Sequence, residues 1–177
     1  MLLLLQKIYE LFELEENKQL LIDAGLQPIA TIDLYRGQTL NPEQFEFYAT
    51  PALFLQWKIR WNKRSVSKVK NGIGELIVHV VSDAPVAETG SIFTNYNEAL
   101  AKVMGYQTIN EILQGCTTEM NSGLDLVDEY PVDTGVMAYQ VQVYEFTAFK
   151  TVPQKPITYV GGNDGDVEVS GELIKQL

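Results

Sequence analysis

Two apolar runs separated by a basic segment constrain the fold of this chain more than any other feature. The runs are PALFLQW at residues 51–57 and IGELIVHVVSD at residues 73–83. Both alternating sets of residues in each run are apolar, which is typical of a central strand covered on both faces. The segment between them, KIRWNKRSVSKVK, holds six of the thirteen Lys and Arg residues and no Asp or Glu. The pattern therefore predicts two buried strands joined by a long cationic loop at residues 58–70.

The charge of this loop contrasts with the rest of the chain, which carries seven basic residues against twenty-three acidic ones. The net charge of −10 argues against a surface that coats nucleic acid non-specifically. Because tryptophan and arginine commonly anchor interfaces, we expect the loop to bind a partner. A solvated loop tip with incidental charge would have the same composition. The expected partner-binding residues are Lys58, Arg60, Trp61, Lys63, Arg64, Lys68 and Lys70.

The remaining segments predict an α+β fold with helices packed on a mixed, mostly antiparallel sheet. An apolar content of 46% can fill the core of one domain. We expect this domain to span residues 1–150, and residues 151–177 to form a C-terminal extension that is partly disordered. The expected order is α-β-β-β-α-α-β-β.

The first elements are a helix at 2–24, which Gly25 ends and which a weak apolar face allows to break near Asn17, and strands at 29–35, 52–57 and 73–82. A helix at 91–104 ended by Gly105, a short helix at 108–115 ended by Gly115, and strands at 118–127 and 136–150 follow. In the last strand Gln140 and Gln142 alternate with apolar residues, which is typical of a half-buried antiparallel strand.

The residues that usually carry chemistry are few. One cysteine and one histidine exclude an intrachain disulfide, a thiolate zinc site and a multi-histidine metal site. His79 lies inside a predicted strand and Cys116 follows a helix-ending glycine, so both are interpreted as packed structural residues. We expect no catalytic residues, no cofactor and no metal, and hence no enzyme.

Carboxylates cluster near the predicted final hairpin. The spacing of Asp125, Asp128, Glu129 and Asp133 matches no calcium-binding loop, and solvated hairpin carboxylates are the favoured interpretation. An enzyme would need a pocket assembled from carboxylates such as Asp83, Asp125 and Asp128, for which the spacing gives no argument.

The start of the chain, MLLLLQKIYELFE, lacks a basic segment and a small-residue cleavage site, so it does not predict a signal peptide. Its apolar run is also too short to span a membrane. We expect a reducing cytoplasmic setting.

The whole pattern resembles the phage tail terminator, or tail-completion, proteins over residues 1–150. A helical start leads to TIDLYRGQ at residues 31–38, and the strand PALFLQW follows. Next come the charged loop and the strand GELIVHVV at residues 74–81, with Asp83 nearby. A helix, a short helix ending in LQG at residues 113–115, and closing strands at residues 123–127 and 136–149 complete the resemblance.

The resemblance implies a structural virion-assembly protein of a tailed phage or prophage. Such a subunit forms a homo-oligomeric ring, a hexamer, that caps the tail tube, stops its growth and joins it to the head connector. The implied partners are other copies of the chain, tail-tube proteins and head-connector proteins. The resemblance implies no cofactor and no catalytic residues, and we expect no small-molecule substrate, no membrane and no sequence-specific nucleic acid as a partner. The implied location is the tail or neck of the virion, which is assembled in the bacterial host cytoplasm.

Two alternatives remain at this stage. The order of elements and the local sequence pattern also resemble those of other neck or head–tail joining proteins. A nucleic-acid-binding module would use the basic loop at residues 58–70, although no recognised nucleic-acid motif is present.

Overall fold

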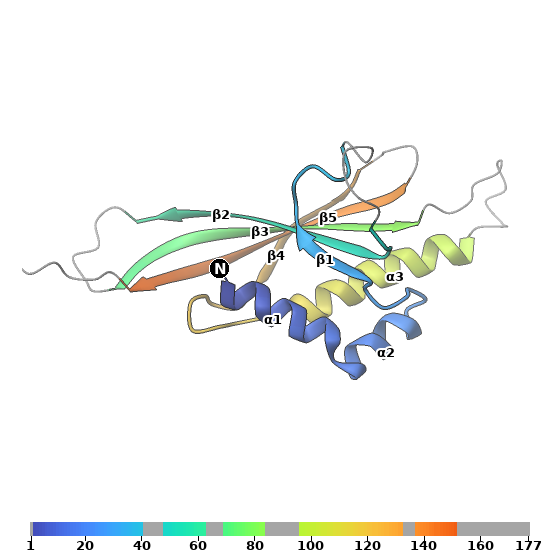
Figure 1. Cartoon of the computed structure of the whole chain (residues 1–177), viewed down its shortest axis with the longest axis horizontal. Helices are drawn as coiled ribbons and strands as arrows, with labels where there is room; N and C mark the ends of the chain where they lie inside the picture. Colours follow the sequence, from blue (N-terminus) through green and yellow to red (C-terminus); the bar gives the residue numbers. More distant parts are fainter. Residues whose placement is uncertain (1, 41–47, 63–68, 84–95, 133–136, 152–177) are drawn as a thin grey trace, which may run out of the picture.

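The computed structural model describes residues 2–40, 48–62, 69–83, 96–132 and 137–151. Within them, helices lie along one face of a five-stranded sheet (Figure 1). This arrangement confirms the predicted single-domain α+β class. The elements in chain order are α1 (Leu2–Glu13), α2 (Glu15–Asp23), β1 (Thr31–Leu34), β2 (Ala52–Trp61), β3 (Val69–Asp83), α3 (Tyr96–Leu113), β4 (Asp125–Pro131) and β5 (Met137–Thr151).

The strands are arranged in the order β1-β2-β3-β5-β4. Only β1 is parallel to its neighbour; the β2–β3, β3–β5 and β5–β4 pairs are antiparallel. The two central strands, β3 and β5, pair along all 15 residues of each. The sheet is therefore built around one long antiparallel ribbon, and β1 and β4 lie at its two sides.

The helical start is divided into two helices, at a break close to the one that the weak apolar face allows. The chain leaves helical geometry at Leu14, whose φ of −65° and ψ of 128° are extended, so α1 and α2 are separate. The break lies three residues before Asn17, whose side-chain amide donates a hydrogen bond to the Leu11 carbonyl over 2.8 Å. Gly25, at a φ of 84°, ends α2 as predicted, because glycine adopts this left-handed conformation at little cost.

The third helix corrects two predictions at once. Gly105 was expected to end a helix and residues 108–115 to start another, but α3 continues through both. A Cβ on Gly105 would lie 3.0 Å from the Cβ of Leu26, so this glycine allows the close approach of α3 to the segment after α2. Thr108 does not cap a helix; its hydroxyl donates to the Met104 carbonyl one turn earlier over 3.0 Å.

The main core lies between the helices and the sheet. Alternate residues of the central strands point toward the helices, and their packing excludes water from both layers. Each fully buried aliphatic or aromatic side chain contributes about 1.5–3 kcal/mol to folding. The residues buried here include Leu4, Ile8 and Phe12 of α1, Leu53 and Leu55 of β2, Leu76, Val78 and Val80 of β3, Ile109 and Leu113 of α3, and Tyr144 and Phe146 of β5.

Strand β5 was expected to be half-buried, with glutamines on its wet face, and the structure shows otherwise. Gln142 is fully buried under α3. Its amide nitrogen donates to the Tyr106 carbonyl over 2.9 Å, and its oxygen accepts from the Tyr144 hydroxyl over 3.0 Å. Burial is tolerated because both polar ends of the amide are satisfied.

The segment before β4 is also not the predicted strand. Residues 118–121 form a tight turn, in which the Thr118 and Asn121 backbones bond each other, and β4 begins only at Asp125. The buried Asn121 side chain donates to the Ser122 carbonyl over 2.6 Å. These local side-chain bonds compete with ladder formation and explain the turn.

A smaller core lies on the opposite face of the sheet. It contains Ala52, Phe54, Val81, Tyr139 and Val141, and the segment after β1 covers it (Figure 1).

His79 is buried beside this second core, with 7% of its surface exposed. Its ring stacks on Tyr35 at a centroid distance of 3.7 Å, and its Nδ1 shares a hydrogen bond with the Tyr139 hydroxyl. Nε2 is buried and has no partner among the described residues. Burial lowers the His79 pKa to about 4 and raises the pKa of Tyr139 to about 12.

Two glycines in β3 make room for aromatic side chains on neighbouring strands. Gly72 is paired with Trp61, and Gly74 is paired with Phe146. A Cβ on Gly74 would lie 2.3 Å from the Phe146 ring, which is closer than real Cβ contacts. Phe146 is buried, so the ring cannot move away without disturbing the core.

We therefore expect Gly74→Ala to lower the free energy of unfolding by about 1–3 kcal/mol, because the added methyl group displaces a buried ring. Chemical denaturation measures this change. The matched control is a double-mutant cycle with Phe146→Leu, in which the two losses should be less than additive. Additive losses would show that Gly74 and Phe146 do not contact each other.

A second prediction uses His79, the only histidine. Because burial disfavours its charged form, its imidazole signal in an NMR titration should show a pKa of about 4, well below the ordinary value of about 6.5. A titration midpoint near 6.5 would contradict the buried placement.

The same shift couples stability to pH. Folding keeps His79 neutral, so the unfolded chain binds the extra proton between pH 6.5 and 4, and stability is lost as the pH falls through that window. Between pH 7.5 and 5 the wild type should lose about 1–2 kcal/mol more than His79→Gln, measured by denaturant unfolding. Equal losses in the two proteins would contradict the coupling.

Candidate interaction surface

The sheet extends beyond the helical layer as an arm made by the end of β2, the start of β3 and the end of β5 (Figure 1). The predicted loop at residues 58–70 is shorter than expected, because residues 58–61 belong to β2 and residues 69–70 belong to β3. Pairing continues to Trp61 opposite Gly72. From the sequence, Lys58 and Arg60 are expected in a loop because they are charged. On an exposed arm, however, one face of a strand can be polar, so charge alone does not exclude a strand.

Strand alternation separates the basic residues onto two faces of the arm. Lys58 and Arg60 lie on the face away from the helices, in line with the exposed Gln56. Trp61 lies on the other face and is 37% exposed. Lys70 is paired with Lys150 on that same face. The structure thus places four of the seven predicted partner-binding residues on the arm; Lys63, Arg64 and Lys68 lie outside the described residues.

The carboxylates of the expected final hairpin lie on β4, at the opposite edge of the sheet from β1 and β2. Asp125, Asp128 and Glu129 are exposed on β4, and Asp133 lies outside the described residues. Among the described residues no group of three or more His, Cys, Asp or Glu side chains is placed to hold a metal ion. The Asp125 carboxylate accepts a hydrogen bond of 3.0 Å from the Gln114 amide.

A row of charges crosses the helix-free face. The register aligns Lys58 with Glu75, Glu75 with Glu145, and Glu145 with Asp125. The like charges of Glu75, Glu145 and Asp125 on adjacent strands repel one another, which lowers the stability of the sheet. These residues are therefore not explained by folding alone. The potential along this row changes from positive at β2 to negative at β4.

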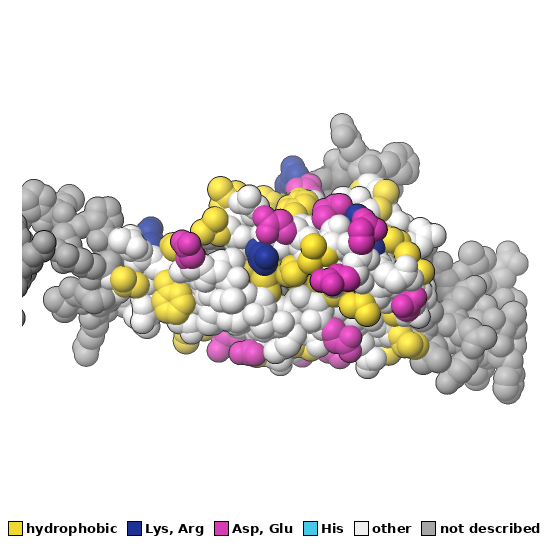
Figure 2. All heavy atoms as spheres, turned by 90° about the horizontal axis from the view of Figure 1, so that it is seen from below, with side chains coloured by type: hydrophobic (Ala, Val, Ile, Leu, Met, Phe, Trp, Pro, Cys, Tyr) yellow, Lys and Arg dark blue, Asp and Glu magenta, His cyan; other side chains and the backbone are white. Residues whose placement is uncertain are grey.

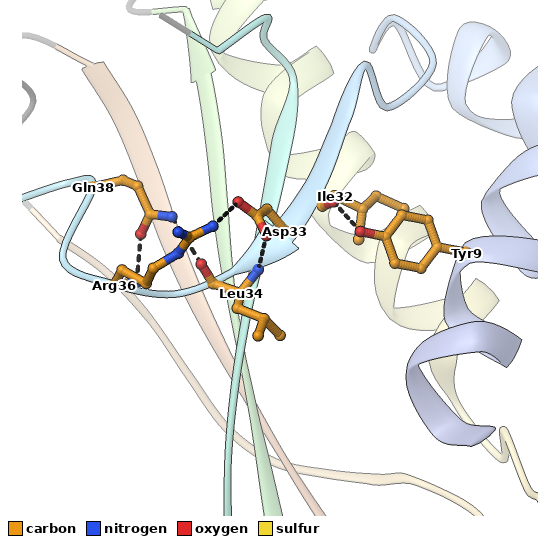
Figure 3. A network of polar contacts seen from close by, with 6 residues as sticks. All are labelled: Tyr9, Ile32, Asp33, Leu34, Arg36 and Gln38. Atoms are coloured by element: carbon orange, nitrogen blue, oxygen red, sulfur yellow. Dashed lines mark hydrogen bonds and ion pairs between the residues drawn. The ribbon is translucent and has the colours of Figure 1, made fainter. Parts of the chain in front are cut away.

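A polar network fixes the turn that follows β1 (Figure 3). Arg36 pairs with Asp33 over 2.7 Å, and the Gln38 amide donates to the Leu34 carbonyl over 2.8 Å. The Tyr9 hydroxyl donates to the Ile32 carbonyl and connects α1 to β1. The network holds the segment that covers the second core.

The helix side of the molecule carries many more Asp and Glu than Lys and Arg side chains, with hydrophobic side chains between them (Figure 2). The hydrophobic residues exposed on α1 and α2 include Leu2, Leu3, Leu20 and Ile22. None of the described helices is both long and apolar enough to cross a bilayer.

The two residues considered for nucleophilic or acid–base chemistry are packed inside the protein. Cys116 belongs to the main core, and burial raises the pKa of its thiol, an effect that Lys7 partly opposes. Burial keeps His79 neutral. The sequence predicted neither the stacking of His79 on Tyr35 nor the edge position of β4. For the stacking, the only available signal was that the segment after β1 and strand β3 each contain a residue with an aromatic ring.

The chain matches no protein-family model and no curated protein sequence. Among solved structures it is similar to a chain described as part of the virion of a native gene transfer agent particle. The TM-score is 0.52, and the match covers 81% of this chain and 92% of that chain at 13% sequence identity. At this identity the similarity establishes a shared fold.

Proposed function

We propose that this protein is a structural subunit of a phage-like virion that acts as a tail terminator. It forms a ring on the end of the tail tube, stops its growth and provides the face to which the head connector binds. The observation that carries the proposal is the fold shared with a chain of a gene transfer agent virion over most of both chains. The sequence resemblance to tail terminators over residues 1–150 supports the finer assignment.

The distribution of charge supports a role in assembly. A net charge of −10 keeps free subunits apart at low concentration, and an acidic ring lets DNA pass without adhering to it. The exposed Lys58 and Arg60 then serve protein contacts. The proposed location is the tail or neck of the virion.

We also propose that the protein acts without catalysis. Its histidine is buried and neutral, and its cysteine is buried with a raised pKa, so neither favours the charged state that acid–base or nucleophilic chemistry needs. The carboxylates of β4 are exposed rather than gathered in a cavity.

The test is electron microscopy of tail tubes, assembled from the tube protein of the same genome, with and without this protein. We expect closed rings on tube ends and shorter tubes when the protein is present during assembly. Sedimentation should show small species for the subunit alone, because charge repulsion opposes self-association.

Bare tube ends together with a persistently monomeric protein would contradict the proposal. DNA binding provides the second arm of the test. Tight binding that weakens steeply with salt would favour a nucleic-acid-binding module instead, because phosphate contacts release counterions.

A further inference from the structure

The side of β2 that faces away from β3 is only partly covered. Strand β1 pairs with residues 52–55 of β2, and the last bond on this side joins the Tyr35 amide to the Leu55 carbonyl. No described strand pairs with β2 beyond that point. Residues 56–61 therefore present a strand edge six residues long, with backbone donors and acceptors directed outward.

Strand β4 provides a second edge on the far side of the sheet. It pairs with β5 on one side only, and no described strand lies on its other side. Every β4 residue except Leu126 is exposed, including Val127 at 57% and Tyr130 at 44%. At Leu126 the strand is covered, because its amide donates a hydrogen bond of 3.2 Å to the Gln114 side-chain oxygen and its side chain packs against the main core. Beyond Leu126, residues 127–131 are exposed and no described strand pairs with them on the outer side.

The two edges are complementary in charge. On the helix-free face, β2 presents Lys58 and Arg60, while β4 presents Asp125 and Asp128. On the helix side, β2 carries the apolar side chains of Trp57, Ile59 and Trp61, and β4 carries Leu126 and the exposed Glu129. Two copies of either edge repel each other, so the charges favour a mixed pair over a two-fold pair.

The strand directions are also compatible. In the order β2-β3-β5-β4 each neighbour is antiparallel to the last, so β2 and β4 run in opposite directions. A rotation about a ring axis preserves strand direction along that axis. When β4 of one copy meets β2 of the next, the two strands are therefore antiparallel, and the sheet continues with its pattern unchanged.

We propose that the edge of β2 at residues 56–61 binds the β4 edge of a second copy of this chain, and that this strand pair is the head-to-tail contact of the assembly. The ring itself rests on the proposed function. Charged edges also protect sheets from aggregation, but protection needs no opposite signs on the two edges. A head-to-tail contact with a closing rotation gives a ring.

Disulfide trapping tests the contact. Gln56, Lys58 or Arg60 is replaced by Cys, each together with Asp128→Cys, in a Cys116→Ala background. Within one copy β2 and β4 are separated by two strands, about 14 Å, which a disulfide cannot span, so only links between copies form. We expect at least one pair to give a ladder of covalent oligomers on mild oxidation. The single-cysteine variants should give none.

A two-fold dimer, in which β4 of one copy pairs with β4 of the other, would give a different cross-linking result. Covalent dimers of the Asp128→Cys single variant, without a ladder from any double variant, would show that β4 pairs with β4 and would overturn the proposal.

Charge exchange provides the second measurement. Arg60→Glu and Asp128→Lys should each raise the protein concentration needed for half-assembly by about tenfold at low salt, and the double variant should recover most of the loss. Both positions face neutral neighbours in register, Ile73 and Val143, so the fold should remain intact, which thermal unfolding checks. The controls are Lys7→Glu on α1 and Glu111→Lys on α3, which change the charge equally and should leave assembly unchanged.

The outcomes separate this inference from the proposed function. Rings on tube ends that are insensitive to the two substitutions, or equally sensitive to the controls, would overturn the edge contact and leave the terminator role intact. A disulfide ladder and charge rescue without any binding to tube ends would support the contact and contradict the terminator role. A wild type that does not assemble, together with double-cysteine variants that do not cross-link, would contradict both.

Discussion

The pairing of β3 with β5 is the interaction on which the rest of the structure depends. It extends along the full length of both strands, so it forms the sheet beneath the helices and continues into the arm. Helices α1 and α3 pack on one face of this ribbon, and the smaller core around His79 covers part of the other. Where neither layer reaches, the ribbon stays exposed, and the charged residues are found there.

This arrangement links folding to assembly. Apolar residues on both faces bury the inner halves of β2 and β3, and charged residues such as Lys58 and Arg60 keep the outer halves soluble. Gly72 and Gly74 let the Trp61 and Phe146 rings lie against the β3 backbone, and the pairing of β3 with β2 and β5 continues through both glycines. An arm held by paired backbone presents Arg60 in a fixed orientation, and fixed orientation reduces the entropy lost on binding.

Much of the fold could be predicted from the sequence. The two-faced apolar runs correctly identified β2 and β3 as central strands, and Gly25 and Gly115 correctly marked helix ends, since both have positive φ. Gly105 was misread because the sequence cannot show that a glycine is required by contact with Leu26. Strand β4 was misplaced because an exposed strand at an edge shows no apolar alternation.

The candidate surface was predicted only in part. The clustering of basic residues was visible, but their separation onto two faces depends on strand register. The carboxylates of β4 were interpreted as solvated hairpin residues, and their relation to Lys58 and Arg60 emerges only from the order of the strands. Residues on β2 and β4 are distant in the sequence and lie at opposite sides of the sheet. No local sequence pattern can therefore show that their charges are complementary.

We propose that copies of this chain assemble by continuing the sheet of one copy into the sheet of the next. A cryo-electron microscopy map of the protein bound to the end of a tail tube tests it most directly. We expect a closed ring in which β4 of each copy lies antiparallel to residues 56–61 of its neighbour, within main-chain hydrogen-bonding distance. A ring whose subunits meet through their helices, with both strand edges facing solvent, would contradict it.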